Sequence, residues 1–151
     1  MGSFILRTGK RKRGKKMRDA YNREIDYMRI SITDRCNLRC RYCMPEDIKN
    51  IPMTELLTYE EITQIVKIAV TLGIRKIKIT GGEPLVRKDV DCLIRMLKET
   101  EGIENVTMTT NGVLLAEKIQ ELREAGLDGV NVSLDTVDKD EFQKITGQDA
   151  V

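Results

Sequence analysis

The chain has 151 residues, and its 40% hydrophobic content is enough to fill the core of one compact domain. It contains no histidine, which excludes a Ser-His-Asp triad, a Cys-His pair and every histidine-ligated zinc, copper or haem site. Only 4% of residues are aromatic and no apolar run is long enough to span a membrane, so we predict a cytoplasmic protein with neither a nucleic-acid nor a membrane partner.

The net charge of +2 is unevenly distributed along the chain. Residues 1–18 have eight lysines or arginines and no acid, which leaves residues 19–151 with 18 basic and 24 acidic side chains. A basic segment of this kind suits nucleic acid or an anionic lipid surface. However, residues 11–16, directly before Met17, can all be encoded by purine-only codons, as in a ribosome-binding site. We therefore expect residues 1–16 to be a translated leader or a disordered tail, with Met17 as the native start and residues 17–151 as the domain.

From Met17 onward, β-rich runs alternate with amphipathic helical patterns. The patterns predict strands at 27–33, 76–80, 105–109 and 129–134, with helices at 58–72, 90–99 and 114–125. An acidic loop is predicted at 135–140. Thr58 followed by Glu61 forms a capping-box pattern, and Gly73 and Gly126 stand where a helix would end.

Strands that alternate with helices run parallel and connect by right-handed crossovers. Two α/β architectures are compatible with this order: an open doubly wound sheet, or part of a βα barrel. In both, ligands bind at the carboxyl ends of the strands. The polar and glycine-rich segments of this chain follow its predicted strands, at 36–43, 81–83, 109–112 and 133–135. A full barrel takes about 250 residues, so about four βα repeats predict a partial barrel, truncated after its N-terminal part.

Three of the four cysteines lie in one short loop after the first predicted strand. Cys36, Cys40 and Cys43 are separated by three and then two residues, so the loop can wrap around one metal centre. An iron–sulfur cubane normally takes four cysteines. Three thiolates would therefore leave one iron with an open coordination position, which a substrate or cofactor can occupy.

Other uses of these cysteines remain open at this point. A structural zinc site needs four ligands, and the fourth would be Cys92, Asp34 or Glu46. A fully ligated electron-transfer cluster and plain buried thiols are further alternatives. Cys92 lies among the apolar positions of the predicted helix at 90–99, so we expect it to be a small core residue. The three arginines of the loop are expected to favour the thiolate form of its cysteines (Arg35, Arg39 and Arg41).

The cysteine loop, with Tyr42 before its last cysteine, resembles the signature of the radical S-adenosylmethionine (SAM) superfamily. Residues 81–84, Gly-Gly-Glu-Pro, resemble the superfamily's motif for the amino group of methionine. Four segments together resemble the GTP 3′,8-cyclase family, which catalyses the first step of molybdenum cofactor (molybdopterin) biosynthesis (residues 29–45, 79–87, 109–112 and 131–135). The resemblance runs from about Met17 to the end of the chain, and it implies a partial radical SAM (βα) barrel.

The resemblance implies that Cys36, Cys40 and Cys43 hold a [4Fe–4S] cluster, whose open iron is chelated by SAM. An external reductant supplies the electron that cleaves SAM to methionine and a 5′-deoxyadenosyl radical. In the family, this radical takes a hydrogen from the ribose of GTP, and C3′ then joins C8 of the guanine. No catalytic side chain beyond the cluster ligands is implied. The implied SAM contacts are Tyr42, Gly82 and Ser133, and the implied GTP contacts are Arg29, Lys78 and Thr109.

The family also has a carboxy-terminal part with a second three-cysteine cluster, which these 151 residues lack. We therefore expect the chain alone to bind the first cluster and SAM weakly without completing the cyclisation. A truncated barrel exposes sheet edges, which favours aggregation or association with a partner such as a second copy in a homodimer. The alternatives are a small iron–sulfur electron carrier, a zinc-bearing or basic-arm nucleic-acid module, and a radical SAM relative that acts on another substrate.

Overall fold

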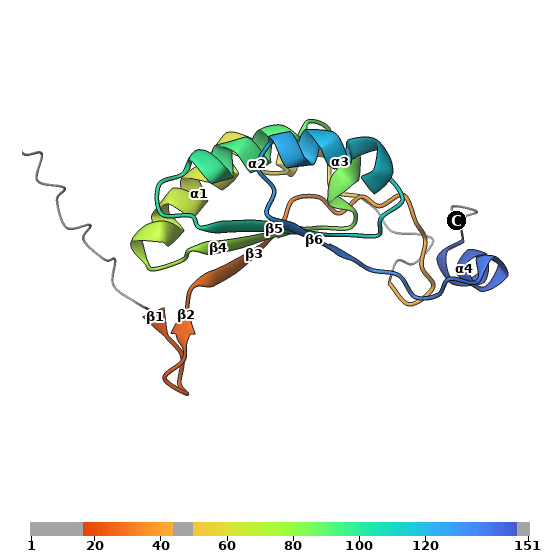
Figure 1. Ribbon diagram of the computed structural model, residues 1–151, viewed down its shortest axis with the longest axis horizontal. Helices are drawn as coiled ribbons and strands as arrows, with labels where there is room; N and C mark the ends of the chain where they lie inside the picture. Colours follow the sequence, from red (N-terminus) through yellow and green to blue (C-terminus); the bar gives the residue numbers. More distant parts are fainter. Residues whose placement is uncertain (1–16, 44–49, 148–151) are drawn as a thin grey trace, which may run out of the picture.

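The computed structural model describes residues 17–43 and 50–147 (Figure 1). The predicted leader at 1–16, the alternative zinc ligand Glu46 and the last four residues lie outside the described residues. A short antiparallel hairpin of β1 (Met17–Arg18) and β2 (Glu24–Ile25) precedes the main sheet. The sequence patterns did not predict this hairpin, since two-residue strands are too short to show a period.

The rest of the described chain alternates strands with helices in the predicted order. The strands of the main sheet are β3 (Tyr27–Ser31), β4 (Lys76–Thr80), β5 (Asn105–Thr110) and β6 (Gly129–Val132). The α-helices are α1 (Tyr59–Thr71), α2 (Val90–Glu99), α3 (Leu115–Glu124) and α4 (Lys139–Thr146), with 3-10 turns η1 (Met53–Glu55) and η2 (Pro84–Val86).

The four strands run parallel and pair in sequence order, β3-β4-β5-β6. Helices α1, α2 and α3 all cover the same face of this sheet (Figure 1). A doubly wound sheet would reverse its strand order at a switch point and would have helices on both faces. Sequential pairing with helices on one face is the arrangement of a βα barrel, so the prediction of a partial barrel with four parallel strands is confirmed.

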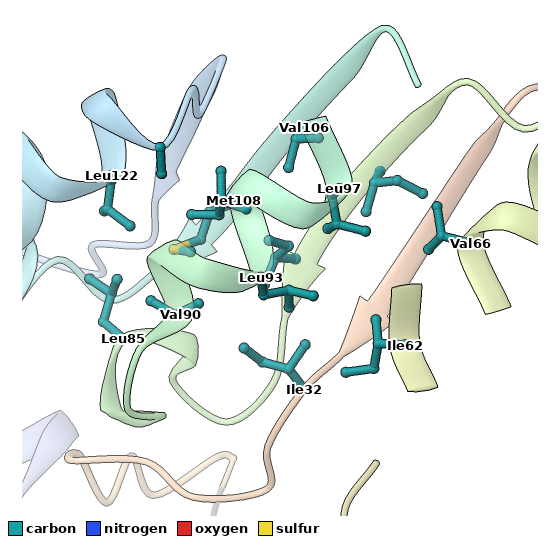
Figure 2. Close-up of a cluster of buried hydrophobic side chains, with 14 of the residues drawn as sticks. Ile32, Ile62, Val66, Leu85, Val90, Leu93, Leu97, Val106, Met108 and Leu122 are labelled. Carbon is teal, nitrogen blue, oxygen red and sulfur yellow. The ribbon is translucent and has the colours of Figure 1, made fainter. Parts of the chain in front are cut away.

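The buried side chains fill the layer between the sheet and the three helices (Figure 2). Ile77 and Ile79 of β4 and Val106 and Met108 of β5 are among its fully buried members. Because side chains alternate along a strand, the residues between them face the other side of the sheet, which the helices leave uncovered. Most polar residues of the strands are therefore gathered on that open face, whereas Thr110 at the end of β5 is buried on the helix side.

The helix boundaries agree closely with the capping signals. Thr58 caps α1, and its side chain accepts from the Glu61 N–H while the Glu61 carboxylate accepts from the Thr58 N–H, so the predicted capping box is confirmed. Gly73 follows the helix with φ of 108°, a conformation that glycine adopts without strain.

The predicted acidic loop at 135–140 is partly wrong, because α4 begins at Lys139. The Asp138 side chain caps this helix by accepting from the Glu141 N–H at 2.9 Å. The prediction for Cys92 is also wrong, since Cys92 is exposed. The apolar face of α2 is formed by Val90, Leu93, Ile94 and Leu97, and position 92 lies on the far side of the helix from that face.

Candidate functional site

The site is built where the chain leaves β3 and β4. The Gly82 N–H donates to the Thr33 carbonyl at 2.7 Å, and the Glu83 N–H donates to the Arg35 carbonyl at 2.8 Å. A Cβ atom on Gly81 would lie 2.5 Å from the Thr33 carbonyl oxygen, and one on Gly82 would overlap the carbonyl of Arg35. Two glycines are therefore needed here so that the segment after β4 can lie directly against the chain that enters the cysteine loop.

Glu83 connects this segment to the end of β5. Its side chain is almost fully buried, with 1% of its surface exposed. Oε1 accepts from the Leu85 N–H at 3.0 Å and from the Thr110 hydroxyl at 2.7 Å, while Oε2 accepts from the Asn111 N–H at 2.7 Å. Buried carboxylates require such partners, because a buried acceptor without a donor is costly. Glu83 therefore fixes the end of β5 against the end of β4.

Asn111 extends the connection to the first cysteine. Its Nδ2 donates to Asn37 Oδ1 at 2.8 Å and to Cys36 Sγ at 3.8 Å. Its Oδ1 accepts from the Val113 N–H at 3.0 Å. The Cys36 sulfur also accepts from the Leu38 N–H at 3.4 Å. Cys36 is thus held between its own loop and the loop after β5.

All three loop cysteines are free thiols, with Cys36 and Cys40 half-buried and Cys43 exposed. Burial raises the pKa of the Cys40 thiol above its ordinary value, and the neighbouring Cys36 and Cys43 raise this pKa further. All three thiols belong to this one loop. A set of three adjacent thiols on one loop fits the ligands of an iron–sulfur cluster, which takes thiolates and gives up their protons on binding.

At Cys40 the prediction that neighbouring arginines favour the thiolate is wrong. The Arg39 guanidinium donates instead to the carbonyl oxygens of Cys36 and Leu38, each at 2.8 Å. Its guanidinium is engaged with the backbone of the loop, and burial is the main cause that raises the pKa of Cys40, with no arginine among the groups that shift this pKa. Arg39 therefore shapes the loop rather than activating that thiol.

The far side of the cysteine loop is fixed by the chain after β6. The Tyr42 hydroxyl donates to Asp135 Oδ2 at 2.7 Å, and this bond is the main reason that the Tyr42 pKa is raised. At the end of α4, the carbonyls of Thr146 and Ile145 accept from the backbone N–H groups of Arg39 and Arg41. The Tyr42 ring itself stays largely exposed at the carboxyl edge of the sheet.

No preformed site for a single metal ion is found within residues 17–43 and 50–147, because no three Cys, Asp or Glu side chains are gathered around one point. Asp34, an alternative zinc ligand, accepts from the Ile51 N–H through Oδ2 at 2.5 Å. Cys92 lies on α2, outside the cysteine loop. The described residues therefore give no support to a closed zinc site made with Asp34 or Cys92.

The open face of the sheet brings together the residues predicted to meet the substrate. Arg29 is paired with Lys78 across β3 and β4, and Thr109 is paired with Asn131 across β5 and β6. Lys78 is half-buried, and its Nζ donates to Asn131 Oδ1 at 2.9 Å. The four strands contain no aspartate or glutamate, so this face has cations without opposing carboxylates on the strands themselves.

Several residues of the site had no role in the sequence prediction. Asn111 and Glu83 were recognised only as parts of strand-end segments, and Asp135 only as the start of an acidic loop. A carboxylate placed between Gly82 and the apolar run Pro84-Leu85-Val86 is a signal that Glu83 is buried. The partners of Asn111 and Asp135 have no comparable local signal, since they lie 75 and 93 residues away.

A family model described as the radical SAM superfamily matches residues 30–150. The chain belongs to the radical SAM superfamily. This membership implies a [4Fe–4S] cluster and SAM, and the match spans the three cysteines and all four strand ends described above.

Within this superfamily the chain is similar to GTP 3′,8-cyclases. It is 58% identical over 132 residues to the enzyme of Thermodesulfovibrio yellowstonii, a match that covers 86% of this chain and 41% of that protein. It is 51% identical over 131 residues to the enzyme of Pelotomaculum thermopropionicum, covering 86% and 40%. The chain thus spans about two fifths of the length of the curated relatives it matches.

Two solved structures share the fold of this chain over most of its length. Streptococcus suis SuiB bound to S-adenosylmethionine matches with a TM-score of 0.67 at 24% identity, over 81% of this chain and 28% of that one. BtrN in complex with AdoMet and 2-DOIA matches with a TM-score of 0.58 at 20% identity, over 85% and 52%. Among the described residues, no helix is both long and apolar enough to cross a membrane.

Proposed function

We propose that this chain forms the cluster-binding and SAM-binding part of a GTP 3′,8-cyclase. The observation that carries the proposal is the joining of the strand ends. The cysteine loop, the Gly-Gly-Glu segment and the Thr-Asn-Gly segment form one hydrogen-bonded unit through Glu83 and Asn111. The similarity to GTP 3′,8-cyclases at 50–58% identity supports this activity over other radical SAM reactions.

In this proposal, Cys36, Cys40 and Cys43 hold the [4Fe–4S] cluster. When bound, the cluster and SAM together supply the one-electron cleavage that yields a 5′-deoxyadenosyl radical, with the electron coming from an external reductant. The chain's own residues hold the cofactor. Gly82 places bare backbone beside the loop, because a Cβ atom at this residue would overlap the backbone carbonyl of Arg35.

Tyr42 and Ser133 complete the proposed SAM site. The Tyr42 hydroxyl is bound to Asp135, which holds the ring at the edge of the cysteine loop. The Ser133 N–H donates to the Thr110 carbonyl at 2.9 Å. This bond continues the β5–β6 pairing one residue past the strand, so Ser133 stands at the carboxyl edge with an exposed side chain.

Arg29, Lys78 and Thr109 are the proposed GTP contacts. They share the open face of the sheet, and the two cations sit directly across from each other in β3 and β4. A triphosphate is complementary to paired cations. Lysine binds phosphate as a point charge, so the fixed Nζ–Asn131 bond is the feature that orients Lys78 here.

The test of cluster and SAM binding is electron paramagnetic resonance of the anaerobically reconstituted and dithionite-reduced chain, recorded with and without SAM. We expect a reduced [4Fe–4S] signal that shifts when SAM is added. The Cys40→Ala variant should lose the cluster, whereas Cys92→Ala should keep it, because Cys92 lies on the outer face of α2. A cluster signal that does not change when SAM is added would instead favour the alternative that the chain is an iron–sulfur electron carrier.

The test of GTP binding is isothermal titration of the reconstituted chain with GTP. Lys78→Ala is expected to weaken binding about tenfold or more, as for the loss of one charge-assisted phosphate contact. Lys76→Ala is the matched control, because Lys76 lies on the same face of the same strand but pairs with Asp26 at its amino end. If the two variants bind GTP with equal affinity, Lys78 is not part of the proposed GTP site.

A further inference from the structure

We infer that Asn111 tunes the reduction potential of the cluster by donating a side-chain hydrogen bond to the sulfur of Cys36. This inference rests on the proposed function, because it concerns the cluster that Cys36 would help to hold. It assigns a role to a residue outside the cysteine loop, at the end of a different strand.

The orientation of the Asn111 amide is fixed by its other partners. Oδ1 accepts from the Val113 N–H at 3.0 Å, so the amide cannot be flipped without setting two donors against each other. Nδ2 must then face the cysteine loop. Nδ2 donates one hydrogen to Asn37 Oδ1, at an N–O distance of 2.8 Å, and the other to Cys36 Sγ, at an N–S distance of 3.8 Å.

The backbone of Asn111 is held just as firmly. Its N–H donates at 2.7 Å to Glu83 Oε2, and that carboxylate is almost fully buried. The neighbouring Thr110 hydroxyl donates to the other oxygen of the same carboxylate. Asn111 therefore reaches Cys36 from a rigid strand end rather than from a free loop, which is what a fixed bond to a metal ligand requires.

This hydrogen bond affects the reduction potential because reduction changes the charge of the cluster. Reduction adds one electron to an iron–sulfur cluster, and part of that charge resides on the sulfur ligands. Hydrogen bonds directed at those sulfurs stabilise the reduced form and raise the reduction potential. Cys36 also receives the backbone N–H of Leu38 at 3.4 Å, so the bond from Asn111 is the side-chain contribution that a substitution can remove.

Two variants remove the donor while keeping the local turn. In Asn111→Asp, a carboxylate oxygen still accepts from the Val113 N–H, but the donor is lost and a negative charge is added. In Asn111→Ser, the hydroxyl can accept the same N–H, and it is too short to reach Cys36. Asn105→Asp is the matched control, because Asn105 begins the same strand at its opposite end.

The experiment is redox titration of the reconstituted chain, followed by electron paramagnetic resonance, together with iron and sulfide content. We expect the potential to become more negative in Asn111→Ser and more negative still in Asn111→Asp, with Asn105→Asp equal to wild type and iron content unchanged. Equal potentials in all four proteins, each with a full cluster, would overturn the role of Asn111. A wild-type chain that binds no cluster would overturn the proposed function itself.

Discussion

The carboxylate of Glu83 and the hydroxyl of Thr110 lie 2.7 Å apart, and both residues are almost fully buried. The two residues come from different strand ends and are separated by 27 positions. Through this bond and the adjoining Asn111 N–H, the end of β5 is held against the segment that supports the cysteine loop. One buried carboxylate therefore organises the carboxyl edge of the sheet.

Replacing Glu83 by glutamine should destabilise the chain by about 2–3 kcal/mol, because an amide has one acceptor oxygen in place of two. In Glu83→Gln, the amide nitrogen would face either the Asn111 N–H or the Leu85 N–H, and a buried donor would lose its partner. Urea denaturation of the cluster-free chain would measure the loss. Glu101→Gln, at an exposed position, is the control and should change the free energy of unfolding by less than about 0.5 kcal/mol.

Gly82→Ala should destabilise the chain by about 1–3 kcal/mol, as expected for overpacking against backbone that cannot move aside. The added Cβ would overlap the Arg35 carbonyl and lie 2.8 Å from that of Asp34. Gly129→Ala offers a matched comparison, since its Cβ would meet only the Thr107 methyl at an ordinary 3.7 Å. Thermal unfolding of both variants would measure the difference, and equal melting temperatures would contradict this account of Gly82.

Asp128 should contribute stability that depends on pH. Burial alone would raise its pKa, but hydrogen bonds from Lys98 Nζ at 2.8 Å and the Val106 N–H at 2.6 Å outweigh burial, and the pKa is lowered from 3.8. A carboxyl group whose pKa is lowered by folding stabilises the fold at pH values above its unfolded-state pKa. This stabilisation is lost as the pH falls through its folded-state pKa.

We therefore expect Asp128→Asn to cost about 1 kcal/mol at pH 7, a magnitude typical of a partly exposed ion pair. The difference from wild type should shrink as the pH falls below about 4. Urea unfolding measured at pH 7 and at pH 3 would show this change. The exposed Asp140 supplies the control, because Asp140→Asn should leave the pH dependence of wild type in place.

Tyr59 should resist ionisation at alkaline pH. Burial raises its pKa to about 12, while the Arg87 guanidinium, 4.4 Å from the ring centroid, opposes the rise. Because folding raises the pKa of Tyr59, this residue stabilises the folded protein at pH values below its unfolded-state pKa of 10.0. The stabilisation is lost as the pH rises toward the folded-state pKa of about 12.

Absorbance titration near 295 nm would follow the tyrosines. At pH 11, wild type should contain one more protonated tyrosine than the Tyr59→Phe variant, because Tyr59 still holds its proton at that pH. Tyr21→Phe removes a tyrosine that is 82% exposed, and it should leave the number of late-ionising tyrosines unchanged. Complete ionisation of wild type by pH 11 in the folded state would contradict the burial argument.

Much of the architecture was predicted from local patterns. β4 and α2 have the predicted boundaries, and α1 begins at the capping box of Thr58 and Glu61. These features were accessible because strand and helix periods and capping residues act over a few neighbouring positions. The helix at Lys139–Thr146 was missed, although Asp138 and Glu141 have the spacing of a cap.

By itself, the sequence determined where the four parallel strands and the three helices between them lie, and it brought the motifs to the carboxyl ends of those strands. Only the tertiary structure decided which side chains meet there. Asn111 bonds to Cys36 and Tyr42 to Asp135 across 75 and 93 residues, and Cys92 faces outward from a helix that seemed to bury it. Such contacts depend on strand register and on the close approach permitted at Gly81 and Gly82, which no local period encodes.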